Sequence, residues 1–211
     1  MSFMFKPYPF TDPVPVNRID LPQELRQAPV AGNAAVAAAL LKKQPKVILL
    51  DGYVSADFGS LVRNIREQRP DEKITVLDMA EAYRSSAELE TLLKDTLPED
   101  RVIDPILLFG KSHPFTVADL IDPEKLNVLA GKIETLRSEP GLVIVCGQGS
   151  VQPQLKALAD VSVFMDVTPL NAVLRINARR CAPLGDAKER ALRYIWRRLY
   201  YFDYEIGRAH V

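Results

Sequence analysis

Gly141-Leu142-Val143-Ile144-Val145-Cys146-Gly147 is the stretch that decides the fold, because five consecutive apolar residues stand between two glycines. A short run that is apolar on both faces and bounded by turn residues is typical of a strand buried in a parallel sheet. Residues 46–51 repeat this pattern, and shorter apolar runs follow at 74–79, 106–109 and 161–167. The sequence therefore predicts a mostly parallel sheet of five strands.

Helical patterns alternate with these runs. Residues 119–138 hold the longest one, with Asp122 and Pro123 as its cap and first turn. Further helices are expected at 31–43, 58–68, 85–97, 169–180 and 186–201. Strands that are apolar on both faces and separated by helices predict a three-layer α/β/α domain. We place this domain at residues 31–204.

The two ends of the chain differ from this pattern. Residues 1–30 hold six of the 16 prolines and little periodicity, so they are expected to form an extended arm. Residues 206–211 read Ile-Gly-Arg-Ala-His-Val, which is the translation of a common sequencing adapter. We therefore expect residues 205–211 to be non-native and the natural protein to continue beyond them.

Composition limits the classes of partner. With 47% hydrophobic and 26% charged residues the chain is globular. Its formal net charge is zero, which argues against nucleic-acid binding, although residues 171–204 carry 8 Lys and Arg against 3 Asp and Glu. That basic end is expected to dock on the acidic remainder or on a further domain. No apolar run reaches the length of a membrane span and no leader pattern is visible, so a cytoplasmic location is expected.

The loop that follows residues 46–51 is the first candidate site, because ligands collect at the carboxyl ends of parallel strands. A phosphate loop has the pattern GxxxxGK[ST], in which backbone N–H groups and the lysine hold the phosphates. Gly52 and Gly59 stand too far apart for this pattern, and Ser60 stands where the lysine belongs. Asp57 adds negative charge. Gly52, Ser55, Gly59 and Ser60 remain the candidate phosphate contacts.

Two arginines in the helix predicted at 169–180 form the second candidate. Arg175 and Arg179 are four residues apart and would share one helix face, as a two-armed clamp for a phosphoryl group. A strand followed by such a helix resembles the late part of P-loop nucleoside and nucleotide kinases. The alternative is a solvated basic face. A third candidate, residues 147–150, is either a ligand cradle or a tight turn.

The sequence offers no metal site. His113 is the one histidine outside the suspect tail, which excludes a histidine-based centre. Asp51, Asp78, Asp104 and Asp166 lie near predicted strand ends and could bind magnesium, but most are expected to cap helices. We expect neither a metal nor a cofactor in this chain.

Several segments, taken in order, resemble the N-terminal region of bacterial class I mannose-6-phosphate isomerase-like proteins. They are residues 99–102, 119–126, 147–149, 159–166 and 193–204. The resemblance implies a kinase-like P-loop domain that has lost its lysine and precedes a cupin isomerase domain. The implied partners are that missing C-terminal cupin domain, where a divalent metal, typically zinc, is expected, and a phosphorylated small molecule.

The leading hypothesis is therefore a kinase-like domain that is itself non-catalytic and belongs to a sugar-phosphate isomerase-type protein. Its role would be structural or phospho-ligand binding, through Arg175 and Arg179. The alternative is an active P-loop-type small-molecule kinase, for a nucleoside or nucleotide, with an unorthodox phosphate loop.

Overall fold

The centre of the molecule is a four-stranded parallel sheet. The computed structural model describes residues 22–24, 29–186 and 188–203. Its strands run in the order β2-β3-β1-β4, with the bounds β1 Val47–Gly52, β2 Ile74–Asp78, β3 Leu142–Cys146 and β4 Val161–Met165. All pairings are parallel, with Leu50 opposite Cys146 on β3 and opposite Val163 on β4. The α/β prediction with a mostly parallel sheet is confirmed.

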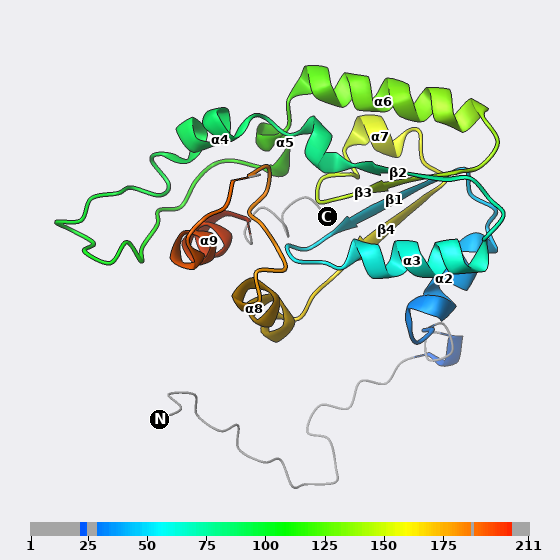
Figure 1. The fold of residues 1–211 in the computed structure, drawn as a ribbon, viewed down its shortest axis with the longest axis horizontal. Helices are drawn as coiled ribbons and strands as arrows, with labels where there is room; N and C mark the ends of the chain where they lie inside the picture. The colour runs from blue at the N-terminus through cyan, green and yellow to red at the C-terminus, as the bar shows by residue number, and fades with distance from the viewer. Residues whose placement is uncertain (1–21, 25–28, 187, 204–211) are drawn as a thin grey trace, which may run out of the picture. The chain divides into compact units, whose positions relative to one another are not determined.

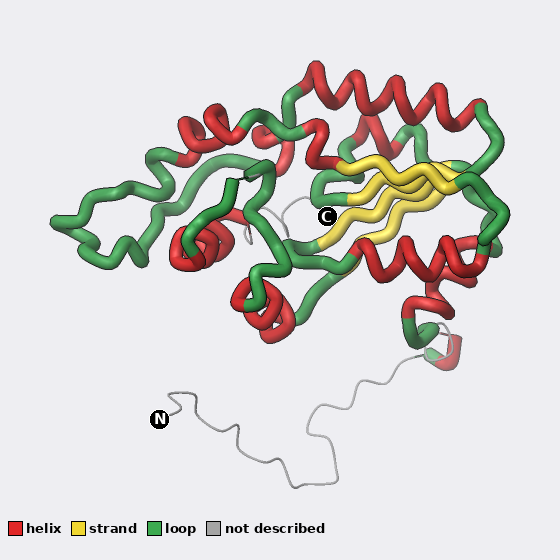
Figure 2. Tube along the Cα trace, in the orientation of Figure 1, coloured by secondary structure: helices red, strands yellow, loops and turns green. Residues whose placement is uncertain are grey.

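Helices cover both faces of the sheet, so the domain has three layers (Figures 1 and 2). The elements besides the strands are α2 Asn33–Leu41, α3 Phe58–Gln68, η1 Met79–Ala82, α4 Ser86–Leu93, α5 Val117–Leu120, α6 Pro123–Ser138, α7 Pro153–Lys156, α8 Pro169–Asn177, α9 Leu192–Arg198 and the π-helix η2 Leu199–Asp203. α6 and α7 lie on one face, and α2 and α3 lie on the other. α8 and α9 lie beyond the carboxyl ends of the strands.

Alternation along β1 explains why both faces need a cover. Val47 and Leu49 pack with the residues of α4 to α7, whereas Ile48 and Leu50 pack with α2 and α3. Every residue of β1 is buried. Side chains of successive strand residues point to opposite faces, so the apolar residues 47–50 lose stabilising burial if either helical layer is removed.

Side-chain caps fix where several helices begin. The Asp122 carboxylate accepts hydrogen bonds from the N–H groups of Glu124 and Lys125 at the start of α6, next to Pro123. Ser85 and Glu88 form a capping box at the start of α4. These residues satisfy N–H groups that have no partner within a helix. Both helix starts were predicted from sequence.

One predicted strand is wrong. Residues 106–109 form no strand, and Ile106, Leu108 and Phe109 are exposed. They belong to a long irregular segment between α4 and α5 that extends away from the sheet (Figure 2). A four-residue apolar run without a sheet neighbour cannot satisfy its backbone groups by strand pairing. Here the Phe109 carbonyl accepts a hydrogen bond from the Arg197 Nε at 2.6 Å instead.

Helix ends also differ from the predictions. α4 ends at Leu93, α8 ends at Asn177, and the final helix begins only at Leu192. The helices predicted from sequence are therefore longer than the observed ones, because helix propensity does not include the tertiary contacts that decide where a helix ends. The predicted arm at residues 1–30 and the tail at 205–211 lie outside the described residues, apart from residues 22–24 and 29–30.

Candidate functional site

A cavity of about 480 Å³ lies at the carboxyl ends of β1, β2 and β3. This is the edge where ligands bind in open parallel sheets. Its walls come from the loop after β1, the ends of β2 and β3 and the connection between α8 and α9. The lining residues are Tyr53, Val54, Ser55, Ala56, Phe58, Asp78, Ala80, Tyr83, Cys146, Gly147, Gln148 and residues 180–185.

Asp51 organises the turn that follows β3. Its side chain is fully buried, and its two carboxylate oxygens accept hydrogen bonds from the N–H groups of Gly52 at 2.7 Å, Gly149 at 3.1 Å and Val151 at 3.0 Å. Gly147 and Gly149 have φ of 132° and 85°, which suits glycine. Residues 147–150 therefore form a tight turn, and Asp51 serves as its anchor.

The loop after β1 is packed against the sheet rather than open. A Cβ added to Gly52 would lie 2.7 Å from the carbonyl oxygen of Met165 on β4, so glycine is required there by close approach. Ser55 adopts a left-handed backbone with φ of 70°. Gly59 lies exposed in the first turn of α3. Of the four candidate phosphate contacts, Gly52 thus ends β1, Ser55 lies in the loop that follows, and Gly59 and Ser60 lie in α3.

The N-terminus of α3 is occupied by a carboxylate of the chain itself. Asp57 is its N-cap and accepts hydrogen bonds from the Ser60 N–H at 3.1 Å and the Ser60 hydroxyl at 2.7 Å. Arg175 of α8 lies 3.3 Å from the same carboxylate and also donates to the Ser55 carbonyl. The Ser60 hydroxyl, joined by the Ser60 N–H and Arg175, holds the pKa of Asp57 below its ordinary value. Asp57 therefore lies at the position where a P-loop binds phosphate.

The predicted two-armed clamp is not formed. α8 ends at Asn177, and Arg179 lies beyond it with a left-handed backbone, φ 52°. Its guanidinium donates to the Arg190 carbonyl at 3.0 Å. Arg175 and Arg179 therefore do not share a helix face, because the helix ends between them. The structure brings Arg175 to the loop after β1 and places Arg179 against the segment that precedes α9.

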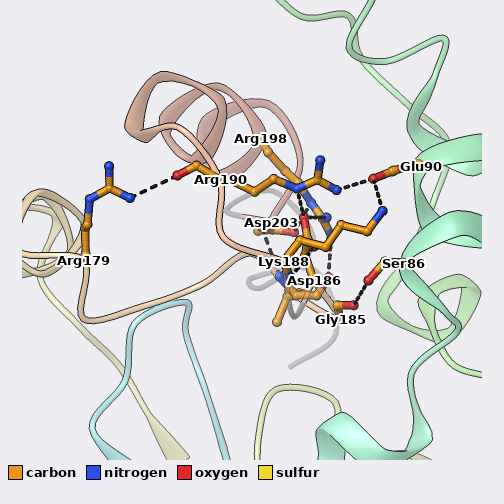
Figure 3. Close-up of polar contacts among 10 residues, drawn as sticks. Ser86, Glu90, Arg179, Gly185, Asp186, Lys188, Arg190, Arg198 and Asp203 are labelled. Atoms are coloured by element: carbon orange, nitrogen blue, oxygen red, sulfur yellow. Dashed lines mark hydrogen bonds and ion pairs between the residues drawn. The ribbon is translucent and has the colours of Figure 1, made fainter.

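Residues 179–186 and 188–190 are called here the strap; residues 180–185 of the strap line the cavity, and buried charges hold the strap (Figure 3). Arg198 is 1% exposed, donates to the Leu184 carbonyl and lies 3.7 Å from carboxylate oxygens of both Asp186 and Asp203. The Leu184 N–H donates to Asp203. These contacts fix the strap over the edge of the sheet.

Ion pairs also tie the strap to α4. Lys188 lies 3.0 Å from the Glu90 carboxylate, and Arg190 contacts the same carboxylate as well as Asp186 at 2.8 Å. Arg197 and Arg198 likewise donate hydrogen bonds to backbone carbonyl groups of the chain. Much of the basic charge near the C-terminal end is therefore paired with groups of the same chain. The sequence patterns gave no indication of which acidic residues would be the partners.

The carboxyl group of Asp203 should make the stability of the folded chain depend on pH. Burial raises the pKa of Asp203 to about 6, against an ordinary value of 3.8. Between about pH 4 and 6 the folded chain therefore holds a proton that the unfolded chain has released, and this contribution to stability is lost as the pH rises. Asp203→Asn has no such loss, so its melting temperature relative to the wild type should rise between about pH 4 and pH 7.

Thermal denaturation of both proteins across this range measures the effect. Two pKa units correspond to at most about 3 kcal/mol. Asp166→Asn removes an exposed carboxylate after β4 and is the control for the substitution itself. A difference between Asp203→Asn and the wild type that does not change with pH would contradict the raised pKa of Asp203.

Three residues that were candidates from the sequence have polar side-chain atoms whose burial no sequence pattern predicted: Ser55, Gln148 and Ser150. Gln148 is 4% exposed, and within the part of the chain that the structure describes neither its amide oxygen nor its amide nitrogen has a hydrogen-bond partner. The hydroxyl oxygens of Ser55 and Ser150 are likewise buried without partners. Tyr83 donates from its hydroxyl to the Gln148 carbonyl at 2.7 Å, and burial raises the pKa of Tyr83. Composition cannot reveal which polar side chains become buried.

The described residues contain neither a candidate metal centre nor a candidate membrane span. Among them, no group of three or more His, Cys, Asp or Glu side chains is arranged to hold a metal ion. In the same part of the chain, no helix has the length and apolar character needed to cross a membrane.

The parallel sheet with helices on both faces defines a three-layer α/β domain, and the loop after β1 contains no lysine. Residues 32–210 match the model of the family described as Domain of unknown function (DUF8485), and the chain belongs to that family. No curated protein matches the chain. Among solved structures, it is similar to a protein of Silicibacter sp. TM1040 that has been proposed to be a fructose transport system kinase. The TM-score is 0.51 at 15% identity, over 85% of this chain and 94% of that one.

Removing the charge of Asp57 should open the α3 N-terminus to anions. Asp57→Ser keeps a capping oxygen for Ser60 but releases Arg175, so inorganic phosphate should bind the variant in the millimolar range, about −4 kcal/mol. NMR titration of the Ser60 and Gly59 amide signals measures this binding. The wild type and the Asp57→Ser/Arg175→Ala double variant are the controls. Equal phosphate binding by all three proteins would show that Asp57 does not block the site.

Proposed function

We propose that this chain is a kinase-like α/β domain that does not transfer phosphoryl groups and acts as a structural or ligand-binding module. The observation that carries the proposal is the ion pair of Asp57 and Arg175 at the N-terminus of α3. A phosphate group at this position would meet the Asp57 carboxylate. Like charges at hydrogen-bond distance repel, and no lysine is present in the loop to offset them.

Arg175 would have to leave Asp57 before it could neutralise a transferring phosphoryl group. Its guanidinium is already used by the Asp57 carboxylate and the Ser55 carbonyl. A phosphorylated ligand bound through Arg175 therefore has to compete with a contact inside the protein. Such competition lowers affinity by the cost of breaking that contact. This supports a non-catalytic role and weighs against phosphate as the main recognition element.

The second candidate is an active small-molecule kinase with an unorthodox phosphate loop. The likeness in fold to the proposed fructose transport system kinase favours it, and that comparison supports kinase chemistry better than an association with an isomerase. Neither the family description nor this structural match names a mannose-6-phosphate isomerase. The association with a cupin isomerase domain and its zinc site stays a hypothesis from the sequence.

A transfer assay separates the two candidates. The full chain is incubated with Mg²⁺ and ATP and, in parallel, with fructose or adenosine as acceptor, and ³¹P NMR follows the γ-phosphoryl group. We expect ATP to remain unchanged. Formation of a phosphorylated acceptor in proportion to protein concentration, and its loss in Arg175→Ala, would establish the kinase candidate and overturn the proposal.

A further inference from the structure

Two residues that line the cavity at the carboxyl edge, Gln148 and Ser55, have polar side-chain groups without a partner among the described residues. Gln148 follows directly after β3 and Gly147, and its side chain is buried, with neither amide atom bonded to a described residue. Ser55, on the opposite loop, has a buried hydroxyl without a partner. Burying such groups without hydrogen bonds is unfavourable, and proteins seldom keep them without a functional reason. A bound molecule would supply the missing partners.

The charges around the cavity indicate what kind of molecule it accepts. Among its lining residues the charged ones are Asp78 and Arg180, which are exposed and of opposite sign. Burial raises the pKa of Cys146 to about 12 and that of Cys181 to about 11, so both thiols stay protonated at neutral pH. The buried wall is therefore uncharged. It would desolvate a phosphate or carboxylate without compensating its charge.

The chemistry of a carboxamide narrows the choice further. The Gln148 side chain offers one acceptor oxygen and a donor nitrogen next to it. Its natural complement is a pair of neighbouring groups, one donor and one acceptor, as in two adjacent sugar hydroxyls or the edge of a nucleobase. Tyr53 and Phe58 add aromatic surface to the same wall. A volume of about 480 Å³ accommodates a sugar or a nucleoside.

We propose that this cavity binds an uncharged small molecule whose adjacent hydrogen-bond donor and acceptor pair with the Gln148 amide. This ligand class rests on the proposed function, because it assumes that Asp57 closes the neighbouring N-terminus of α3 to phosphate. The strap supplies the remaining wall, and the contacts of Arg198 and Asp203 with Leu184 hold it in place. Adjacent hydroxyls and a nucleobase edge are the two sources of this one ligand chemistry.

Ligand-observed NMR tests the site with defined probes. D-fructose represents adjacent hydroxyls and adenosine a nucleobase, and fructose 6-phosphate and AMP are their charged counterparts. We expect one uncharged probe to bind the full chain with a dissociation constant of about 1 mM or lower, and its phosphorylated counterpart to bind no more tightly. Gln148→Leu should weaken that binding at least about tenfold, the effect of one lost hydrogen-bonded pair. Absence of binding by both uncharged probes would overturn the inference.

The same variant gives a readout that needs no ligand. If the Gln148 amide awaits a ligand, Gln148→Leu removes a buried unsatisfied group, and the melting temperature should rise by about 3 °C. Gln154→Leu is the matched control, because Gln154 is exposed on α7 and bonds to Asn127. That control should leave probe binding unchanged. A lower melting temperature for Gln148→Leu would assign the amide a structural role and contradict the inference.

The outcomes are separable from those of the transfer assay. Phosphoryl transfer from ATP would overturn the proposed function. The titration with uncharged probes would still decide whether the cavity binds such a molecule. A failure of both uncharged probes would remove the cavity's ligand class and leave the closed phosphate position intact.

Discussion

Arg198→Leu is expected to lower the free energy of unfolding by about 3–5 kcal/mol, the usual cost of removing one partner of a buried ion pair. Arg198 is 1% exposed and lies 3.7 Å from carboxylate oxygens of Asp186 and Asp203. Leucine would leave Asp203 facing an apolar side chain and the Leu184 carbonyl without its donor. The strap would then lose its main attachment to the end of the domain.

Urea denaturation measures this change. Arg193→Leu is the matched control, because Arg193 lies exposed on the same helix, α9, and its replacement should alter stability by no more than about 0.5 kcal/mol. Arg198→Lys keeps the charge without the planar fork and should fall between the two. A loss below about 1 kcal/mol for Arg198→Leu would mean that the buried charges do not hold the strap.

Asp51→Ala is expected to cost about 4 kcal/mol, because two buried N–H groups and one partly buried N–H group would lose their acceptor at about 1–3 kcal/mol each. The donors belong to Gly52, Gly149 and Val151. They join the loop after β1 to the turn after β3, so the variant should also loosen the edge of the cavity. The free energy of unfolding and the amide hydrogen-exchange rates of Gly149 and Val151 are the measurements.

Two variants bracket that result. Asp51→Asn has the same shape but only one acceptor oxygen, and we expect roughly half of the alanine cost. Asp166→Ala removes an exposed carboxylate that accepts from its neighbour Val167 and should change stability by less than about 1 kcal/mol. If Asp51→Ala were no more harmful than Asp166→Ala, Asp51 would not be the anchor of the turn.

Local patterns were sufficient to predict the sheet. The apolar runs of β1 and β3, residues 47–50 and 142–146, are visible in a single sequence because burial on both faces requires them. Caps such as Asp122 and Ser85 are local as well, since cap and helix lie within a few residues. The strand predicted at 106–109 is wrong because a short apolar segment has the same pattern in a loop as in a strand.

The arrangement of the site depends on contacts that no local pattern contains. Arg175 and Asp57 are separated by 118 residues, and their pairing follows from the way α8 crosses near the loop after β1. The helix end at Asn177, which separates Arg179 from Arg175, is also decided by tertiary packing. The unpartnered amide of Gln148 could be identified only after the turn around Asp51 had been placed.

Calorimetric titration of the full chain with Mg²⁺ and ATP tests the central proposal most directly, that Asp57 and Arg175 close the N-terminus of α3 to phosphate. We predict no binding with a dissociation constant below about 1 mM, because the triphosphate would have to displace the Asp57 carboxylate without a lysine to hold it. Binding in the micromolar range that is lost in Arg175→Ala would contradict the claim.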